Sequence, residues 1–403
     1  MNLCRLALFV LGVASVLPAT TTAQPAPVKT HGALVHCVAV SPDGKTLATA
    51  GFDNLVKLWD VGPDGTLKLA KVLVGHSAPV YGVVFHPADT KIVATASQDK
   101  TARIWDVTEG KAKAGSKDAP EAVFEVTKAK FELKGHTDIV DTIAFSPDGK
   151  TLATAGADKA VKLWNPADGK ELKSLGTHDG SVYAVAFSPD GKLLASAGAG
   201  KDNLVKIWDV KEQKELTQLR GHEQPVTAVA FTDNELVVTA SMDRTIRTWT
   251  TKEAKKDPPK DVKDTKDTKE PKKDAKDTKD AKEPKKDTKD AKEPKKDTKD
   301  AKEPKKDAKD VKEPKDTKDP KELKKFGPTT DDPYAIAWSP ATKTLAVCGY
   351  SGQITIWSLD ADKPKFTRAI KSPGYCVVFG ADGKGVFTGH DNGTAAFTPI
   401  EAK

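Results

Sequence analysis

One unit of sequence recurs about every 45 residues, and it limits the folds that this chain can adopt. Its clearest copy runs from Gly135 to Trp164. In this copy, short runs of alternating apolar residues flank a Ser-Pro-Asp-Gly turn, a pattern that predicts antiparallel strands joined by a tight hairpin. Because one such unit cannot bury both of its faces, the copies must stack on one another. We therefore expect an all-β fold built from repeats.

Five copies share a His near their start and a Trp near their end. They span His31–Trp59, His76–Trp105, His136–Trp164, His178–Trp208 and His222–Trp249. Two weaker copies follow, one around Tyr334 and Trp357 and one from Tyr375 to Phe397, where Phe stands in the place of Trp. The recurring Gly-His and Trp-Asp pairs resemble those of the WD-repeat family. The resemblance covers nearly all of the chain after its N-terminal segment, except one charged interval.

This resemblance implies a seven-bladed β-propeller with four strands in each blade. The chain ends soon after the third strand of the last copy. A strand near residues 27–30 is therefore expected to complete blade seven and close the ring, which removes exposed sheet edges. On this reading, blades one to five occupy residues 24–250, and blades six and seven occupy residues 326–403.

The charged interval, residues 251–325, separates the fifth and sixth copies. It holds 29 Lys and 22 acidic residues, which accounts for the whole net charge of +7. Pro recurs in it every ten residues and apolar residues are almost absent, so we expect a disordered insertion. Residues 321–327 resemble residues 214–220, the expected outer strand of blade four. The insertion should therefore lie between the third and outer strands of blade five, and a shorter one, about residues 107–130, lies at the same place in blade two.

The first 23 residues have the pattern of a secretory signal peptide. Arg5 precedes an apolar run of about 12 residues, and small residues follow up to Ala23. The run is shorter than the roughly 20 residues that a membrane span needs. We expect cleavage after Ala23, no integral membrane segment in the mature chain, and export to a periplasmic or extracellular location. A signal of this kind on a repeat protein favours a bacterial source.

Composition and motifs argue against several other classes of function. Outside residues 251–325 the basic and acidic residues balance, so we expect no nucleic-acid partner. Cys37, Cys348 and Cys376 form no disulfide framework and are expected as small buried residues. No phosphate loop, hydrolase elbow or clustered metal-ligand motif occurs, so we expect no cofactor, no metal and no catalytic residue. We expect a monomer.

Five copies share a His, a Thr or Ser, an Asp and a Trp. The sets are His31, Thr49, Asp53, Trp59; His76, Thr95, Asp99, Trp105; His136, Thr154, Asp158, Trp164; His178, Ser196, Asp202, Trp208; and His222, Thr239, Asp243, Trp249. Such sets resemble a hydrolase triad. Because five copies in one chain do not make an active site, we interpret them as buried hydrogen-bond networks within the blades. Blade six has Thr329, Val347 and Ser351 at the matching places, and we expect blades six and seven to be softer.

Other positions vary from blade to blade. The residue five after the repeat His is His36, Tyr81, Asp141, Tyr183, Thr227, Tyr334 and Tyr375. The residue just before the turn Asp is Phe52, Gln98, Ala157, Lys201, Met242, Tyr350 and His390. The residue three after the His is Leu34, Pro79, Ile139, Ser181, Pro225, Asp332 and Pro373. By resemblance, the first two sets face the top mouth of the central channel, where the family binds partners.

These patterns leave three hypotheses. The first is a non-enzymatic, exported scaffold that binds protein or peptide partners through aromatic residues and Met at the channel mouth, because such residues are enriched in interfaces. The second is an enzyme that uses Asp141, Asp332 and His390 at the same mouth. The third is a propeller tethered to an anionic surface by its charged insertion, although the near-balanced charge of that insertion makes the attraction weak and salt-sensitive. We favour the first.

Overall fold

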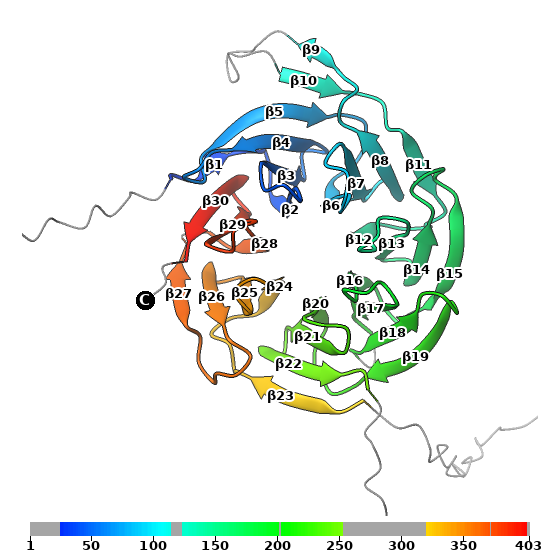
Figure 1. The fold of residues 1–403 in the computed structure, drawn as a ribbon, viewed down its shortest axis with the longest axis vertical. Helices are drawn as coiled ribbons and strands as arrows, with labels where there is room; N and C mark the ends of the chain where they lie inside the picture. The colour runs from blue at the N-terminus through cyan, green and yellow to red at the C-terminus, as the bar shows by residue number, and fades with distance from the viewer. Residues whose placement is uncertain (1–24, 114–122, 201–202, 253–319, 371, 401–403) are drawn as a thin grey trace, which may run out of the picture. The chain divides into compact units, whose positions relative to one another are not determined.

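The computed structural model describes residues 25–113, 123–200, 203–252, 320–370 and 372–400. Seven separate sheets surround a central opening, each with its strands ordered from the opening outwards (Figure 1). The described residues therefore form a seven-bladed all-β propeller, which confirms the fold expected from the repeats. No described segment forms a helix of the length and apolar character needed to cross a membrane.

Each blade contributes strands at matching positions around the ring. The inner strands are β2 (Val35–Val40), β6 (Val80–Phe85), β12 (Val140–Phe145), β16 (Val182–Phe187), β20 (Val226–Phe231), β24 (Pro333–Ser339) and β28 (Gly374–Phe379). The second strands are β3 (Thr46–Gly51), β7 (Ile92–Ser97), β13 (Leu152–Gly156), β17 (Leu193–Gly198), β21 (Leu236–Ser241), β25 (Thr344–Gly349) and β29 (Gly385–His390). The third strands are β4 (Val56–Val61), β8 (Thr101–Asp106), β14 (Ala160–Trp164), β18 (Val205–Asp209), β22 (Thr245–Thr250), β26 (Gln353–Trp357) and β30 (Thr394–Pro399). The outer strands are β5 (Leu67–Leu73), β11 (Phe131–Lys134), β15 (Glu171–Thr177), β19 (Lys214–Leu219), β23 (Glu322–Phe326), β27 (Phe366–Ala369) and β1 (Val28–Lys29).

The outer strand of blade seven comes from the start of the described chain. In β1, Val28 pairs with Ala395 and Lys29 with Thr394 of β30. The Thr30 amide then donates a hydrogen bond of 2.9 Å to the Gly393 carbonyl. The ring is thus closed by a strand that precedes blade one, as the sequence predicts.

Blade five resumes after the long charged interval. Its third strand β22 pairs with β23, and residues 253–319 lie between them in the chain. This pairing confirms the predicted place of the insertion, between the third and outer strands. The expected interval, 251–325, overlaps β23, so the blade begins again before residue 325. The disorder expected for the insertion concerns residues outside the described part of the chain.

The shorter insertion of blade two forms two strands that the sequence did not indicate. They are β9 (Lys111–Lys113) and β10 (Val123–Val126), which pair with each other in antiparallel fashion. β10 also lies parallel to β5, so the sheet of blade one has six strands. The insertion of blade two therefore extends the outer edge of the blade-one sheet (Figure 1).

The apolar core lies between blades rather than inside any one of them. In one cluster, Val56 and Leu58 of blade one pack with Val83 and Trp105 of blade two. Equivalent clusters join each blade to the next around the ring. Because each blade buries its faces only against neighbours, the copies stabilise one another.

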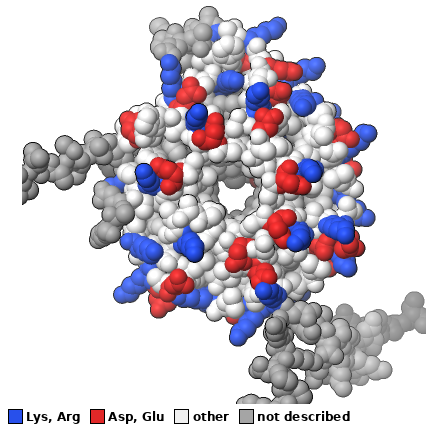
Figure 2. Space-filling model, in the orientation of Figure 1, with Lys and Arg blue, Asp and Glu red and all other residues white. Residues whose placement is uncertain are grey.

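On the face shown in Figure 2, acidic and basic side chains alternate around the opening, and neither sign gathers into a patch.

Candidate functional site

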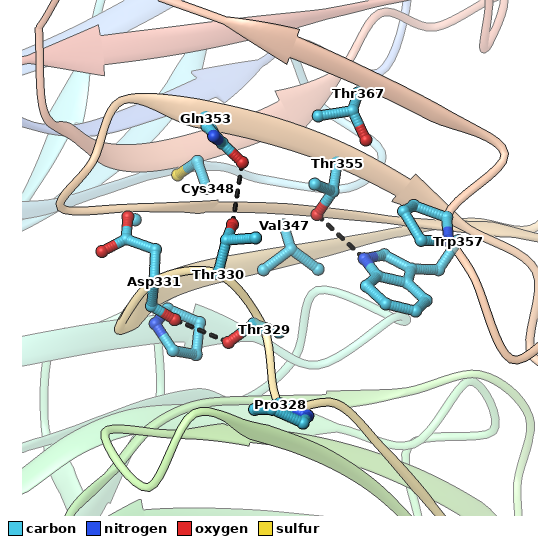
Figure 3. Close-up of a pocket in the computed structure, with 13 residues that line it drawn as sticks. Pro328, Thr329, Thr330, Asp331, Val347, Cys348, Gln353, Thr355, Trp357 and Thr367 are labelled. Atoms are coloured by element: carbon cyan, nitrogen blue, oxygen red, sulfur yellow. Dashed lines mark hydrogen bonds between the residues drawn. The ribbon is translucent and has the colours of Figure 1, made fainter.

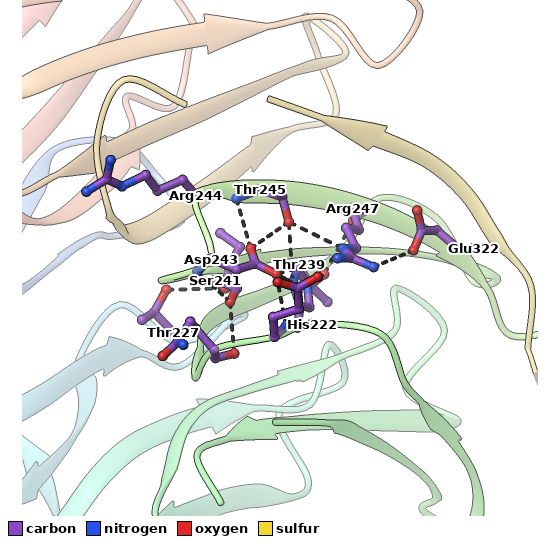
Figure 4. Close-up of polar contacts among 12 residues, drawn as sticks. His222, Thr227, Thr239, Ser241, Asp243, Arg244, Thr245, Arg247 and Glu322 are labelled. Carbon is purple, nitrogen blue, oxygen red and sulfur yellow. Dashed lines mark hydrogen bonds and ion pairs between the residues drawn. The ribbon is translucent and has the colours of Figure 1, made fainter. Parts of the chain in front are cut away.

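The shared His, Thr, Asp and Trp form buried chains of hydrogen bonds. In blade five, His222 Nδ1 lies 2.8 Å from Asp243 Oδ2, and its Nε2 lies 2.7 Å from Thr239 Oγ1 (Figure 4). The indole of Trp249 donates to the same hydroxyl at 2.9 Å. The corresponding bonds in blades one, two and three are 2.7–3.0 Å long. In each of these blades, the series of hydrogen bonds thus joins the loop that carries the His to the second and third strands of the same blade.

Burial and hydrogen bonding act against each other on the carboxylates of these chains. Burial alone raises the pKa of Asp99, but hydrogen bonds from His76 and Thr101 outweigh it and hold that pKa below its usual range. The same balance lowers the pKa of Asp243 beside His222 and Thr245. The carboxylates are therefore ionised and fully engaged. Because the imidazoles and hydroxyls are buried as well, these sets are inaccessible to a substrate.

Blade four keeps part of this arrangement. His178 Nε2 lies 2.7 Å from Ser196 Oγ, to which Trp208 donates at 2.8 Å. The Asp202 of this set lies outside the described residues. Burial, with the positive charge of Lys206, lowers the pKa of His178 to about 4, so the ring is neutral at physiological pH.

Blade seven builds a similar bond from a different position, which corrects one prediction. His390 was expected at the channel mouth, but it is 2% exposed and its Nε2 lies 3.0 Å from Thr388 Oγ1. It ends β29 at the place that Gly51 occupies in β3. A Cβ at Gly51 would lie 2.4 Å from Nδ1 of His31, so a side chain at this position enters the space of the repeat His. His390 therefore supplies a buried imidazole that its own loop lacks.

Blade six has a cavity of about 140 Å³ at the equivalent place. Thr329 and Val347 line it, where blades one, two, three and five have His and Thr. The Trp357 indole donates instead to Thr355 at 2.8 Å (Figure 3). The Thr329 hydroxyl donates to the Asp331 carbonyl at 2.6 Å. In blade six, hydrogen bonds between residues close in sequence and an empty cavity therefore replace the buried His–Thr–Trp hydrogen-bond series of blades one, two, three and five.

A β-bulge in every inner strand sets the geometry of the channel mouth. The pairing of each inner strand with its neighbour skips one residue, and the skipped residues are His36, Tyr81, Asp141, Tyr183, Thr227, Tyr334 and Tyr375. A bulge leaves its extra residue unpaired and re-aims the side chain. All seven line a single cavity of about 440 Å³ that all seven inner strands enclose. We call this end of the central channel the channel mouth.

Aromatic rings follow one another around half of the channel mouth. The series of ring contacts, here called the aromatic arc, runs through Phe52, Tyr81, His36, Tyr375, Tyr334 and Tyr350. The centroids of His36 and Tyr81 are 4.6 Å apart, and Tyr334 stacks on Tyr375 at 5.0 Å. Such pairs hold their partners in defined orientations. The arc ends in Tyr350, which is 60% exposed and open to solvent.

The other half of the channel mouth is more polar. Tyr183 is 40% exposed, and Thr227 donates to the Pro333 carbonyl at 2.7 Å. Met242 lines the cavity beside them. On the blade next to that of Tyr81, burial together with the charges of Asp138 and Asp158 raises the pKa of Asp141 to about 7.

A backbone hydrogen bond marks the second set of expected mouth residues. The amide of Phe52 donates to the Leu34 carbonyl at 2.9 Å. The same bond joins Gln98 to Pro79, Ala157 to Ile139, Ala199 to Ser181, Met242 to Pro225, Tyr350 to Asp332, and Asp391 to Pro373. The equivalent residues are therefore Ala199 rather than Lys201 in blade four, and Asp391 rather than His390 in blade seven. Lys201 itself lies outside the described residues.

Both corrections have the same origin. The predicted position is defined as the residue before an Asp, but blade four has extra residues before its Asp and blade seven has Asn392 at the matching place. The acceptors of this bond are the seven residues that the sequence analysis names three positions after the repeat His or its equivalent. Counting forward from the second strand would have found Ala199 and Asp391.

The residues of the enzyme hypothesis do not meet. Asp141 lines the cavity, Asp332 forms a 2.9 Å ion pair with Arg244, and His390 is buried on Thr388. Among the described residues, no group of three or more His, Cys, Asp or Glu could hold a metal ion. The three cysteines in the described part of the chain are free, and burial raises the pKa of the Cys348 thiol to about 12.

Comparison with known proteins identifies the family of this chain. A family model described as "WD domain, G-beta repeat" matches residues 25–60, 67–106, 127–165, 169–209, 213–250 and 320–358. These stretches cover more than half of the chain, and each contains the outer strand of one blade followed by the first three strands of the next. The chain belongs to the WD40 repeat family. WD40 propellers generally act as non-enzymatic scaffolds for protein interactions.

Relatives of this WD40 protein share only part of their length with it. Over 150 residues it is 33% identical to Coronin-7 of Bos taurus, covering 36% of this chain and 14% of that protein. Over 142 residues it is 32% identical to Protein transport protein sec13 of Aspergillus fumigatus, covering 34% and 42%. Over 167 residues it is 26% identical to the Transcriptional corepressor LEUNIG_HOMOLOG of Arabidopsis thaliana, covering 36% and 21%. The chain thus spans less than half of each relative.

Proposed function

We propose that this WD40 protein is a non-enzymatic scaffold that binds a protein or peptide partner at the channel mouth. The observation that carries this proposal is the aromatic arc, a series of six rings in successive contact, four of which line one cavity. Tyr and other aromatic residues are enriched in the cores of interfaces, because they combine a large apolar area with a polar tip. The cavity can receive a side chain of the partner, and the exposed Tyr350 at its edge can contact the partner's surface.

The shape of the channel mouth favours an extended segment over a flat surface. The cavity of about 440 Å³ is large enough for one or two side chains, and the bulge residues around it project from rigid strands. A partner that inserts side chains here would leave the outer edges of the blades free. The protein would then hold partners by one end of its ring, as a scaffold does.

Export is part of the same proposal. Its support is the sequence pattern of residues 1–23, which lie outside the described part of the chain. We expect N-terminal sequencing of the mature protein to begin at Gln24 and the protein to be recovered outside the cytoplasm. Recovery of an uncleaved chain in the cytoplasm would contradict export and leave the binding proposal unchanged.

Partner capture from the native exported fraction tests the binding site. Replacing Tyr81, Tyr183 and Tyr375 together with Ala should abolish capture of partners that the wild-type protein retains. The matched control replaces Leu172, Leu216 and Leu323, which are exposed on the outer strands of three blades, with Ala. Capture should survive in this control. Equal capture by both variants would contradict binding at the channel mouth.

A further inference from the structure

The cavity at the channel mouth has a one-sided set of charges. Its lining combines the rings of His36, Tyr81, Tyr183, Tyr334 and Tyr375 with one carboxyl group, that of Asp141. Within the described part of the chain, neither Lys nor Arg lines the cavity. Burial lowers the pKa of His36, which keeps this ring neutral at physiological pH. The described lining is thus aromatic and acidic, without a compensating cation.

Three described basic side chains, each in a loop between a second and a third strand, are engaged elsewhere. Lys100 donates to the Thr137 carbonyl at 3.0 Å, and Lys159 donates to the Asp179 carbonyl at 2.8 Å. Arg244 forms its 2.9 Å ion pair with Asp332. Among the described residues, no side chain donates a hydrogen bond to the Asp141 carboxyl or forms an ion pair with it. Within the described part of the chain, the Asp141 carboxyl therefore lines the cavity without a hydrogen-bonding or ionic partner.

Asp141 and four rings of the aromatic arc line the same cavity. Tyr81 of the arc and Asp141 stand on the inner strands of consecutive blades, and both line the cavity. The charge of Asp141 adds to the larger effect of burial in raising the pKa of Tyr81. Aromatic faces carry negative electrostatic potential and attract cations that lie over them. An anion here would meet the carboxylate and the ring faces, and a neutral chain would leave the carboxylate unpaired.

We propose that the channel mouth binds a positively charged side chain, Lys or Arg, of the partner segment, between the aromatic arc and the Asp141 carboxylate. This inference rests on the proposed function and gives the chemistry of the partner. The cation pairs with Asp141 while ring faces such as those of Tyr334 and Tyr375 cover its apolar stem. The cavity thus prefers a positively charged side chain to a neutral one. The residues next to it in the partner contact the edge of the channel mouth.

Binding of two matched peptide pairs to the full chain tests this inference. The probes are acetyl-Gly-Gly-Arg-Gly-Gly-amide against its citrulline counterpart, and acetyl-Gly-Gly-Lys-Gly-Gly-amide against its norleucine counterpart, measured by titration calorimetry. At least one charged peptide should bind on the order of tenfold more tightly than its neutral counterpart, because both the ion pair and the cation–π contact are lost with the charge. Equal affinities within both pairs, or no binding by either charged peptide at millimolar concentration, would overturn it.

Variants separate the named contacts from general effects on the fold. Asp141→Asn should weaken binding of the charged peptide about tenfold, whereas Asp179→Asn, which alters an exposed acidic residue outside the cavity, should not. Tyr334→Phe keeps the ring face and should retain affinity, whereas Tyr334→Leu should lose it. Equal effects of both Asp variants, or of both Tyr334 variants, would overturn the assignment. Melting temperatures identify any variant that has failed to fold.

Failure of this inference can be told apart from failure of the proposed function. If the peptides show no preference for charge but the triple Tyr variant still loses partner capture, the channel mouth binds partners by other chemistry. If the triple Tyr variant also captures partners normally, the proposed function fails as well. Each outcome therefore decides one of the two statements.

Discussion

Asp141 is the residue whose chemistry departs most from that of an ordinary surface carboxyl. Burial and the charges of Asp138 and Asp158 raise its pKa to about 7, whereas a free Asp titrates near pH 3.9. The titratable side chains on the adjacent inner strands are Tyr81 and Tyr183. Between these two pH values the folded chain holds a proton that the unfolded chain releases. Stability should therefore fall as the pH rises through this window.

Asp141→Asn should remove this loss of stability. At pH 8 the variant should melt at a higher temperature than the wild type, by roughly 2–4 °C for each kcal/mol gained. At pH 4 both Asp and Asn are neutral in the folded chain, so the melting temperatures should agree. Thermal melts at both pH values, with Asp179→Asn as the control, check this. A gain of the same size at pH 4 and pH 8 would show that ionisation of Asp141 is not the cause.

Thr154 shows how much a buried chain of hydrogen bonds depends on one hydroxyl. Its Oγ1 lies 2.8 Å from His136 Nε2 and accepts from the Trp164 indole at 2.7 Å. Thr154→Val keeps the shape but leaves both partners buried and unpaired, so it should lower the free energy of unfolding by about 2–4 kcal/mol. Thr137→Val, an exposed position, should change it by less than about 0.5 kcal/mol. Denaturant unfolding measures both, and a small effect at Thr154 would contradict a structural role for this chain.

At the scale of the blade, blade six is the place where the repeat is incomplete. Its cavity of about 140 Å³ lies beside Thr329, Val347 and Trp357, where a His and a Thr are missing. Restoring both residues should be more favourable than restoring either one, because the imidazole and the hydroxyl satisfy each other.

A double-mutant cycle tests this coupling in blade six. Val347→Thr alone buries an unpaired hydroxyl and should lower the free energy of unfolding by about 1 kcal/mol. Thr329→His with Val347→Thr should recover that loss, with a favourable interaction energy of about 0.5–3 kcal/mol. The free energies of unfolding of the two single variants and the double variant give this value. If the changes in the free energy of unfolding of the two single variants simply add up in the double variant, positions 329 and 347 are not equivalent to the His and Thr positions of the other blades.

Much of each blade could be predicted from sequence because the repeat is local. Alternating apolar residues, the turn and the terminal Trp all lie within one copy, so the strands and the buried sets follow from spacing. The outer strand of blade five was predicted after a long insertion because residues 321–327 resemble those of blade four.

Other features depend on contacts that spacing does not record. β10 lies beside β5, about 50 residues earlier in the chain, and both short strands of its hairpin lack a distinctive pattern. The buried position of His390 depends on the loss of a His elsewhere in the same blade, which leaves space for it. The bulges explain why the mouth residues point into the channel, and pairing registers alone reveal them.

At the scale of the whole propeller, closure brings the seven bulge residues, four of them Tyr, to one opening. Each inner strand carries its bulge at the same level, and the strand β1 joins the last blade to the first. Blades six, seven, one and two are neighbours in the closed ring, so rings that are far apart in the sequence form one aromatic arc. The site is therefore a property of the closed ring, since no single repeat contains it.

Photo-crosslinking from the end of the aromatic arc tests most directly whether partners bind there. Tyr350, 60% exposed at the channel mouth, is replaced by p-benzoylphenylalanine, and Leu216, 48% exposed on an outer strand, is replaced in a second protein. Both are irradiated in the native fraction from which the wild-type protein is recovered. Binding at the channel mouth predicts a covalent adduct from position 350 and none from position 216. An adduct from position 216 with none from position 350 would contradict it.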